Sequence, residues 1–214
     1  MLKLSIKSKI KNYHLIFDDS KKYLLNQKNI NNIFIVDSFF KNKIKIISNK
    51  IIYIDSSEKT KSFENIHKII KKLIKLNANK KTNLIVVGGG VLQDTAGFIA
   101  SIYFRGLKWT FLPTTLLGMG DSCIGGKTSI NFYGYKNQLG NFNPPDQILI
   151  DIKFLKTLPI IQIISGIGEM SHYFFVSSNL DYRYFTNYIT KIDYEKLNIK
   201  DLILKSLQIK KKNY

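Results

Sequence analysis

The 214-residue sequence contains a single cysteine, Cys123, so a framework of disulfides within the chain is excluded. Apolar runs are also short, and none approaches the roughly 18–20 residues that a membrane-spanning helix needs. The opening residues, MLKLSIKSKI, alternate apolar and polar side chains and lack the apolar core and cleavage site of a signal peptide. Together these absences predict a cytoplasmic protein without a membrane partner.

Arginine is nearly absent as well, because Arg105 and Arg183 are the only arginines among 33 basic residues. The formal net charge of +18 therefore comes from lysine, which is spread along the chain beside asparagine and isoleucine, as AT-rich coding would produce. Proteins that read bases favour arginine, whose guanidinium binds guanine through two hydrogen bonds. We therefore expect no nucleic-acid partner and keep a basic nucleic-acid binder only as an alternative. A cleft lined by lysine would instead attract anionic substrates such as sugar phosphates.

Strand and helix patterns alternate through the first 152 residues, and a 44% content of hydrophobic residues is ample for a buried core. Two short strands are expected at 3–10 and 13–19, and buried strands at 31–37, 51–55 and 83–87. Helices are expected over 39–50, 63–76 and 94–104. This alternation is typical of an α/β domain with a parallel sheet.

The pattern changes near 152–158, after which the segments look helical, with no convincing strand between them. Pro159 is suited to the start of a helix. The sequence stops at KKKNY directly after a helical pattern, and about 60 residues would be few for a second core. We therefore expect an α/β domain over 1–152 and an incomplete all-α domain over 153–214, truncated at Tyr214.

The segment VVGGGVLQD reads as a strand, a glycine turn and a helix start. Glycine lets the backbone bend sharply and approach a ligand closely, and the free N–H groups of a helix start bind phosphate. A tight turn without any ligand is the alternative, in which Asp94 simply caps the helix or places a negative charge at its start.

The segment PTTLLGMGDSCIGGKTSIN, residues 113–131, gathers hydroxyl, carboxylate and ammonium groups around a second glycine pair. Hydroxyls and lysine bind phosphate and ribose oxygens, and Asp121 could hydrogen-bond sugar hydroxyls. GGKT is also the end of a P-loop motif, but Gly120 and Lys127 are one residue too far apart for that motif. A nucleoside triphosphatase is therefore disfavoured.

The segment GIGEMSHYFF places Glu169 and His172 three residues apart, on one face of a helix. Metal sites in helix bundles use this spacing. The spacing alone leaves two possibilities open, a metal-binding pair and an ordinary polar pair.

Five segments together resemble the 3-dehydroquinate synthases, within the wider sugar phosphate cyclase group: GGGVLQDTAGFIASIYFRG, PTTLLGMGDSCIGGKTSIN, KNQLGNF, FLKTLP and SGIGEM. The resemblance covers nearly the whole chain. More distant glycerol dehydrogenases and iron-dependent alcohol dehydrogenases share a GGG turn but lack the DSxxGGKTxxN stretch. The resemblance implies a Rossmann-like NAD-binding domain, a helical domain that holds a divalent metal (zinc or cobalt), and a homodimer.

The resemblance also implies a reaction of the shikimate pathway, which leads to the aromatic amino acids. In it, 3-deoxy-D-arabino-heptulosonate 7-phosphate becomes 3-dehydroquinate. A substrate hydroxyl is transiently oxidised with NAD, phosphate is eliminated, and the carbocycle then closes.

Site residues are implied position by position. Those for NAD are Asp37, Glu58, Lys61, Gly89, Gly90, Val91, Leu92, Gln93, Asp94, Thr114, Thr115, Lys127, Lys136, Phe154, Leu155, Lys156 and Thr157. Those for the substrate are Asp121, Lys127, Asn137, His172, Lys210 and Arg105, the last reaching the site of a partner subunit. Glu169 is the implied metal ligand.

Two departures from the family pattern keep alternatives open. His172 stands where these enzymes have a lysine, which leaves open either a rearranged local hydrogen bonding or the alternative of a related cyclase that acts on another heptulose phosphate. The family's two metal-binding histidines have no counterpart, since His14 and His67 lie far upstream. A non-catalytic NAD-binding fragment is therefore the other alternative.

Overall fold

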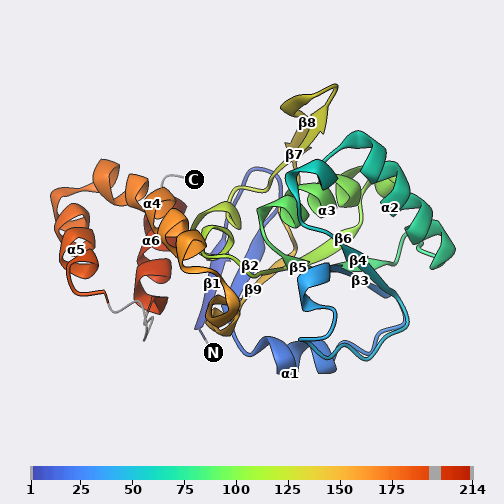
Figure 1. Ribbon diagram of the computed structural model, residues 1–214, viewed down its shortest axis with the longest axis horizontal. Coiled ribbons are helices and arrows are strands. Elements are labelled where there is room, and N and C mark those ends of the chain that lie inside the picture. The colour runs from blue at the N-terminus through green and yellow to red at the C-terminus, as the bar shows by residue number, and fades with distance from the viewer. Residues whose placement is uncertain (1, 193–198, 213–214) are drawn as a thin grey trace.

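A seven-stranded sheet forms the centre of the computed structural model, which describes residues 2–192 and 199–212 (Figure 1). The order of the strands is β1-β2-β9-β6-β5-β3-β4, and all neighbours are parallel except β1 and β2. The expected α/β fold is confirmed. The strands are β1 (Leu2–Ile6), β2 (Tyr13–Phe17), β3 (Asn32–Asp37), β4 (Ile51–Ile54), β5 (Asn83–Gly88), β6 (Lys108–Pro113) and β9 (Gln147–Ile150).

The central strands are apolar without alternation because helices cover both faces of the sheet. Ile33–Val36 in β3 and Leu84–Val87 in β5 are at most 1% exposed. Helix α1 (Ser20–Leu25) lies on one side, and α2 (Phe63–Lys75) and α3 (Gly90–Ile102) lie on the other (Figure 1).

Helix α2 begins at Phe63 as its apolar spacing predicts and ends at Lys75, one residue before the expected end. The Ser62 side chain caps its start by accepting a hydrogen bond from the amide of Asn65. Ile66, Ile69 and Leu73 form its buried face. Helix α3 begins at Gly90, four residues before the expected start, because the glycine turn itself forms the first turn of the helix.

The helix expected over 39–50 is wrong. Only the short 3₁₀ helix η1 (Ser38–Phe40) forms there, and the chain then runs through a turn to β4. Partly buried Ile44 and Ile46 alternate with exposed lysines, which is the period of an extended chain. Isoleucine is β-branched and loses side-chain freedom in a helix, so this segment gains little from helix formation.

A hairpin of β7 (Lys127–Phe132) and β8 (Tyr135–Phe142) projects from the α3 side of the sheet (Figure 1). Thr128 and Asn141 join the two strands by a hydrogen bond of 2.8 Å. The sequence reading identified neither this hairpin nor β6 and β9. Almost every residue of β8 is exposed, so its sequence carries no inward and outward alternation.

After β9 the described residues contain only helices, so the expected change to an all-α part is confirmed. These helices are η5 (Ile152–Thr157), α4 (Ile160–Ser177), α5 (Asn179–Ile189) and α6 (Lys200–Lys212). Pro159 directly precedes α4 at its N-cap position, so the helix starts there as expected, and the helices gather at one end of the molecule (Figure 1). The division into domains at 152–153 stays a prediction, and Tyr214 lies outside the described residues. No described helix combines the length and the apolar character that crossing a bilayer requires.

The contrast between neighbouring residues of α2 tests this fold. Leu73 is 0% exposed and Ile74 is 60% exposed. We expect Leu73→Ala to lower the free energy of unfolding by about 2–4 kcal/mol, since it leaves a cavity in the core. Ile74→Ala should change it by less than about 1 kcal/mol. Urea denaturation of both variants measures the difference, and equal losses would contradict this orientation of α2.

Candidate active site

The strand order reverses between β3 and β5, because the chain leaves β3 for the edge strand β4 and then returns to the other side of β3. In open parallel sheets, ligands bind at the carboxyl ends of the strands beside such a reversal. Asp37 ends β3, and its carboxylate caps η1 by accepting the Phe39 amide at 3.0 Å. Gly88 ends β5 beside it.

The turn after β5 is closely packed, and this requires glycine. A Cβ atom on Gly88 would lie 2.7 Å from Leu92 Cδ2, and one on Gly89 would lie 2.9 Å from Thr115 Cγ2. A Cβ on Gly90 would meet nothing within 4 Å, so this side of the turn is open. Helix α3 begins here without a side-chain cap. Its first N–H groups therefore have no capping side chain and can hold an anion such as a pyrophosphate.

The predicted NAD residues around this turn differ in their accessibility. Gly90, Gln93 and Asp94 line a cavity. Leu92 is fully buried in the core, and Val91 is half-buried. Among the predicted threonines, Thr114 is buried, while Thr115 accepts a hydrogen bond from the Gly118 amide at 3.1 Å.

The cavity beside this turn has a volume of about 520 Å³ and lies where the sheet, the hairpin and the C-terminal helices meet. It is lined by Lys61, Gly90, Gln93, Asp94, Leu117, Asp121, Ser122, Ile124, Gly125, Lys127, Ser129, Asn137, Tyr173 and Lys210. It therefore gathers predicted cofactor residues and predicted substrate residues around one space.

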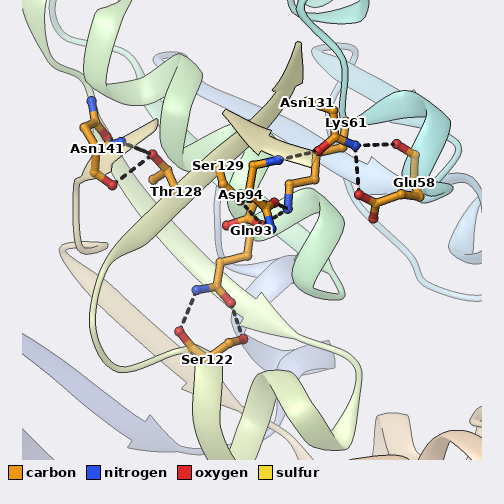
Figure 2. A network of polar contacts seen from close by, with 10 residues as sticks. Glu58, Lys61, Gln93, Asp94, Ser122, Thr128, Ser129, Asn131 and Asn141 are labelled. Carbon is orange, nitrogen blue, oxygen red and sulfur yellow. Dashed lines mark hydrogen bonds and ion pairs between the residues drawn. The ribbon is translucent and has the colours of Figure 1, made fainter. Parts of the chain in front are cut away.

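One wall of the cavity is an ion pair between Lys61 and Asp94, 2.5 Å apart (Figure 2). Lys61 also donates to Asn137 Oδ1 at 2.7 Å, and the Ser129 hydroxyl, with one proton, lies 2.9 Å from both Asp94 Oδ2 and Asn137 Oδ1. Burial raises the pKa of Asp94 above its ordinary value, and the ion pair with Lys61 opposes that shift. The Asn137 oxygen faces these donors, and none of the described residues accepts a hydrogen bond from its amide nitrogen, which can therefore donate to a ligand.

The hairpin loop is fastened to the segment before α2. Asn131 donates to Glu58 Oε1 at 2.8 Å, and its own side-chain oxygen accepts the Asn137 amide at 2.9 Å (Figure 2). Asn137 has a positive φ of 58°, a conformation that asparagine tolerates better than most residues. Glu58 therefore helps to place Asn137 in the cavity.

The opposite wall is built around Asp121, which lies in the π-helical turn η4 (Gly118–Ser122). The Lys210 ammonium is 2.5 Å from Asp121 Oδ1 and 2.7 Å from its main-chain oxygen. The Tyr173 hydroxyl donates to the same Oδ1 at 2.5 Å. Burial and the neighbouring Asp121 carboxylate raise the pKa of Tyr173, so its hydroxyl stays protonated at neutral pH.

Gln93 connects the two walls. Its amide nitrogen donates to the main-chain oxygen of Ser122 at 2.6 Å, and its oxygen accepts the Ser122 hydroxyl at 2.7 Å (Figure 2). Because Gln93 is buried, these two bonds fix η4 relative to α3.

Lys127 is the exposed cation of the cavity. Among the described residues, no carboxylate lies within ion-pair distance of it, whereas Lys61 and Lys210 each have one. Gly125 and Gly126 lead into strand β7 and not into a helix, which agrees with the rejection of a P-loop.

Other predicted residues lie outside this cavity. Lys136 and Arg105 are exposed, and Arg105 follows the end of α3. Phe154 is buried, and Thr157 is exposed.

Leu155 and Lys156 border a second cavity of about 820 Å³ near Phe17. The second cavity is larger, but each of its three aspartates, Asp18, Asp19 and Asp151, already accepts hydrogen bonds from neighbouring residues. Lys153 lies 2.6 Å from Asp19, and the buried Asp151 carboxylate accepts both the amide and the hydroxyl of Ser20. The smaller cavity, which also borders the glycine turn at the start of α3, is the better candidate for the active site.

Glu169 and His172 lie on α4 as predicted, and both side chains are exposed. Within 2–192 and 199–212, no group of three histidine, cysteine, aspartate or glutamate side chains could hold a metal ion. The described residues therefore do not form a complete metal site around Glu169.

The sequence reading missed Tyr173, Ser122 and Ser129. Ser129 lies two residues after Lys127 and so shares its face of β7, a relation visible only once the strand is recognised. Tyr173 lies four residues after Glu169 on the same side of α4.

Comparison with known proteins finds one family along most of the chain. The family model for the N-terminal part of 3-dehydroquinate synthase matches residues 51–165, more than half of the chain. A 3-dehydroquinate synthase of Dictyoglomus thermophilum is 36% identical over 218 residues, which cover 99% of this chain and 61% of the relative. One of Dictyoglomus turgidum is 47% identical over 134 residues, covering 63% of this chain and 38% of the relative. The chain thus spans 38% to 61% of the length of these relatives.

Solved structures share the fold. A 2-deoxy-scyllo-inosose synthase, in complex with carbaglucose-6-phosphate, NAD+ and Co2+, matches 83% of this chain and 52% of its own, with a TM-score of 0.72 and 23% identity. The 2-epi-5-epi-valiolone synthase of Streptomyces hygroscopicus, with NAD+ and Zn2+ bound, matches 79% of this chain and 51% of its own. Its TM-score is 0.65 and its identity 26%.

The ion pair between Lys61 and Asp94 should make the stability of the fold depend on pH. Because the pKa of Asp94 is raised, the stability that its protonated form contributes is present in acid and is lost as the pH rises through that pKa. Lys61→Met removes the opposing charge, so we expect it to lower the free energy of unfolding by about 2–3 kcal/mol at neutral pH. The loss should shrink at acidic pH, as the Asp94 carboxyl with its raised pKa takes up a proton. Denaturation at both pH values measures it, with the exposed Lys59→Met as control, and a pH-independent loss would contradict it.

Proposed function

Because the chain belongs to the 3-dehydroquinate synthase family, we propose that it forms the NAD-binding and sugar-phosphate-binding part of such an enzyme in the cytoplasm. The reaction is the conversion of 3-deoxy-D-arabino-heptulosonate 7-phosphate to 3-dehydroquinate with release of phosphate. The observation that carries this proposal is the cavity in which the open glycine turn, the free Lys127 ammonium and the Asp121 carboxylate face one space.

The residues of the glycine turn fit NAD. The open side of Gly90 and the uncapped start of α3 suit the pyrophosphate, and Asp37 at the end of β3 suits a ribose hydroxyl. When bound, NAD would supply reversible oxidation of a substrate hydroxyl. Glu58, Lys61 and Asp94 hold the neighbouring wall of the cavity in place.

The remaining cavity residues suit a sugar phosphate. Lys127, free of a carboxylate partner among the described residues, attracts the phosphate group. The amide nitrogen of Asn137 donates to a ligand oxygen, and Asp121 accepts from a sugar hydroxyl. These contacts would hold the reacting carbon beside the cofactor and so reduce the entropy cost of the reaction.

Two further proposals concern groups beyond the cavity. We assign Arg105, exposed and outside the cavity, to the site of a partner subunit in a homodimer. Glu169 is assigned to a divalent metal, but the described residues supply no complete ligand set. No step of the proposal therefore passes through zinc or cobalt.

The glycine turn gives a test of cofactor binding. We expect Gly90→Ala to fold normally, because the added Cβ meets no atom within 4 Å. The same methyl group would occupy the space that the pyrophosphate needs, so the affinity for NAD+ should fall about tenfold or more. Isothermal titration calorimetry measures the affinity. Gly168→Ala, at another open glycine, is the matched control and should leave NAD+ binding unchanged.

Phosphate release tests the reaction itself. The protein is incubated with NAD+, with and without Zn2+, and with 3-deoxy-D-arabino-heptulosonate 7-phosphate or another heptulose 7-phosphate. Release from the first substrate supports the proposed reaction. We expect Lys127→Met to raise KM about tenfold or more, since it removes a charge-assisted contact to phosphate.

The same assay separates the other candidates. Release from another heptulose phosphate alone would favour the related cyclase that His172 suggests, and His172→Lys should then shift the preference back. NAD+ binding without release from any substrate would identify a non-catalytic NAD-binding chain.

A further inference from the structure

Tyr173 has no role in the family resemblance, yet it lies at the centre of one cavity wall. It is half-buried on α4 and adjoins His172 in the sequence. Its hydroxyl contacts Asp121 Oδ1 at 2.5 Å, and the Lys210 ammonium lies 5.4 Å from the centre of its ring. Tyr173 therefore contacts both predicted substrate residues of this wall.

These contacts leave the two oxygens of Asp121 unequal. Oδ1 accepts from Tyr173 and from Lys210. Oδ2 accepts no hydrogen bond from any residue that the structure describes. Since the Tyr173 hydroxyl stays protonated, it can only donate to the carboxylate, and it does so to the oxygen that Lys210 also holds. The carboxylate is thus held in one orientation.

We propose that Tyr173 is a positioning residue that holds Oδ1 of Asp121 so that Oδ2 faces a hydroxyl of the sugar phosphate in the cavity. The phosphate lies at Lys127 and the hydroxyl at Asp121, so the two ends of the ligand are recognised by different side chains. This assignment rests on the proposed function. It predicts that loss of the Tyr173 hydroxyl weakens binding of the sugar phosphate and leaves binding of inorganic phosphate unchanged.

A purely structural role for Tyr173 predicts something different. If the hydroxyl only attached α4 to η4, its loss would loosen the whole wall. Affinities for phosphate, sugar phosphate and NAD+ would then fall together, along with thermal stability. The ratio of two affinities in one variant therefore distinguishes the roles.

The experiment is isothermal titration of the full chain, saturated with NAD+, with inorganic phosphate, 3-deoxy-D-arabino-heptulosonate 7-phosphate and carbaglucose 6-phosphate. We expect Tyr173→Phe to weaken binding of the sugar phosphate about tenfold, since a hydrogen bond to a charged group is lost. Binding of inorganic phosphate and NAD+ should stay within about twofold, because neither contacts Asp121. Tyr182→Phe is the matched control, as Tyr182 is 49% exposed on α5 and outside the cavity.

Asp121→Asn tests the same contact from the other side. In that background, Tyr173→Phe should weaken sugar phosphate binding no further, because the residue acts through the carboxylate. Additive losses, an equal loss for inorganic phosphate, or no change for the sugar phosphate would each overturn the proposal.

The choice of ligands separates this inference from the proposed function. If the wild-type chain binds carbaglucose 6-phosphate but not the heptulosonate, and Tyr173→Phe weakens that binding selectively, the positioning role stands and the substrate assignment fails. If the wild-type chain binds neither sugar phosphate, both are overturned.

Discussion

The close packing of strand β5 against helix α3 is the constraint on which the candidate site depends. Gly88 and Gly89 have no room for a Cβ atom, because Leu92 and Thr115 lie where it would be. This packing brings the start of α3 directly to the end of the strand. The first helical N–H groups have no side-chain cap, and Gln93 and Asp94 lie within the first turns. From there, Gln93 fixes Ser122, and Asp94 holds Lys61.

The electrostatics of the cavity are local and differ from those of the whole chain. The chain carries a formal charge of +18, but two of the three cavity lysines are neutralised by their own carboxylates. One cation, Lys127, remains without a carboxylate partner among the described residues. Burying a charged group costs free energy, and the raised pKa of the buried Asp94 carboxyl reflects this cost. It also gives each ammonium a fixed position, whereas a cluster of like charges would repel.

The sequence was informative where local pattern and final structure agree. Strands β3 and β5 are apolar throughout, and α2 has one apolar face with a serine cap, so each could be recognised alone. The helix predicted over 39–50 is absent because its isoleucines alternate in an extended chain. Strand β8 was not predicted because it is exposed on both faces.

The site was predicted as a set of residues but not as an arrangement. The contacts from Lys61 to Asn137 and from Tyr173 to Asp121 span 76 and 52 positions, and only tertiary packing brings them together. The resemblance pointed to most of these residues, whereas Tyr173 became visible only through its contact with Asp121.

The contact from Lys210 to Asp121 spans 89 positions, and this separation has a consequence for biosynthesis. A ribosome releases the glycine turn, Lys61 and Asp94 well before α6 leaves the exit tunnel. Domains generally fold as they emerge, beginning at the N-terminus. The wall of the cavity beside the glycine turn can therefore assemble on the nascent chain, while the Asp121 wall waits for the last described helix. Translation order thus becomes assembly order, and the wall that holds Asp94 would form before the wall that holds Asp121.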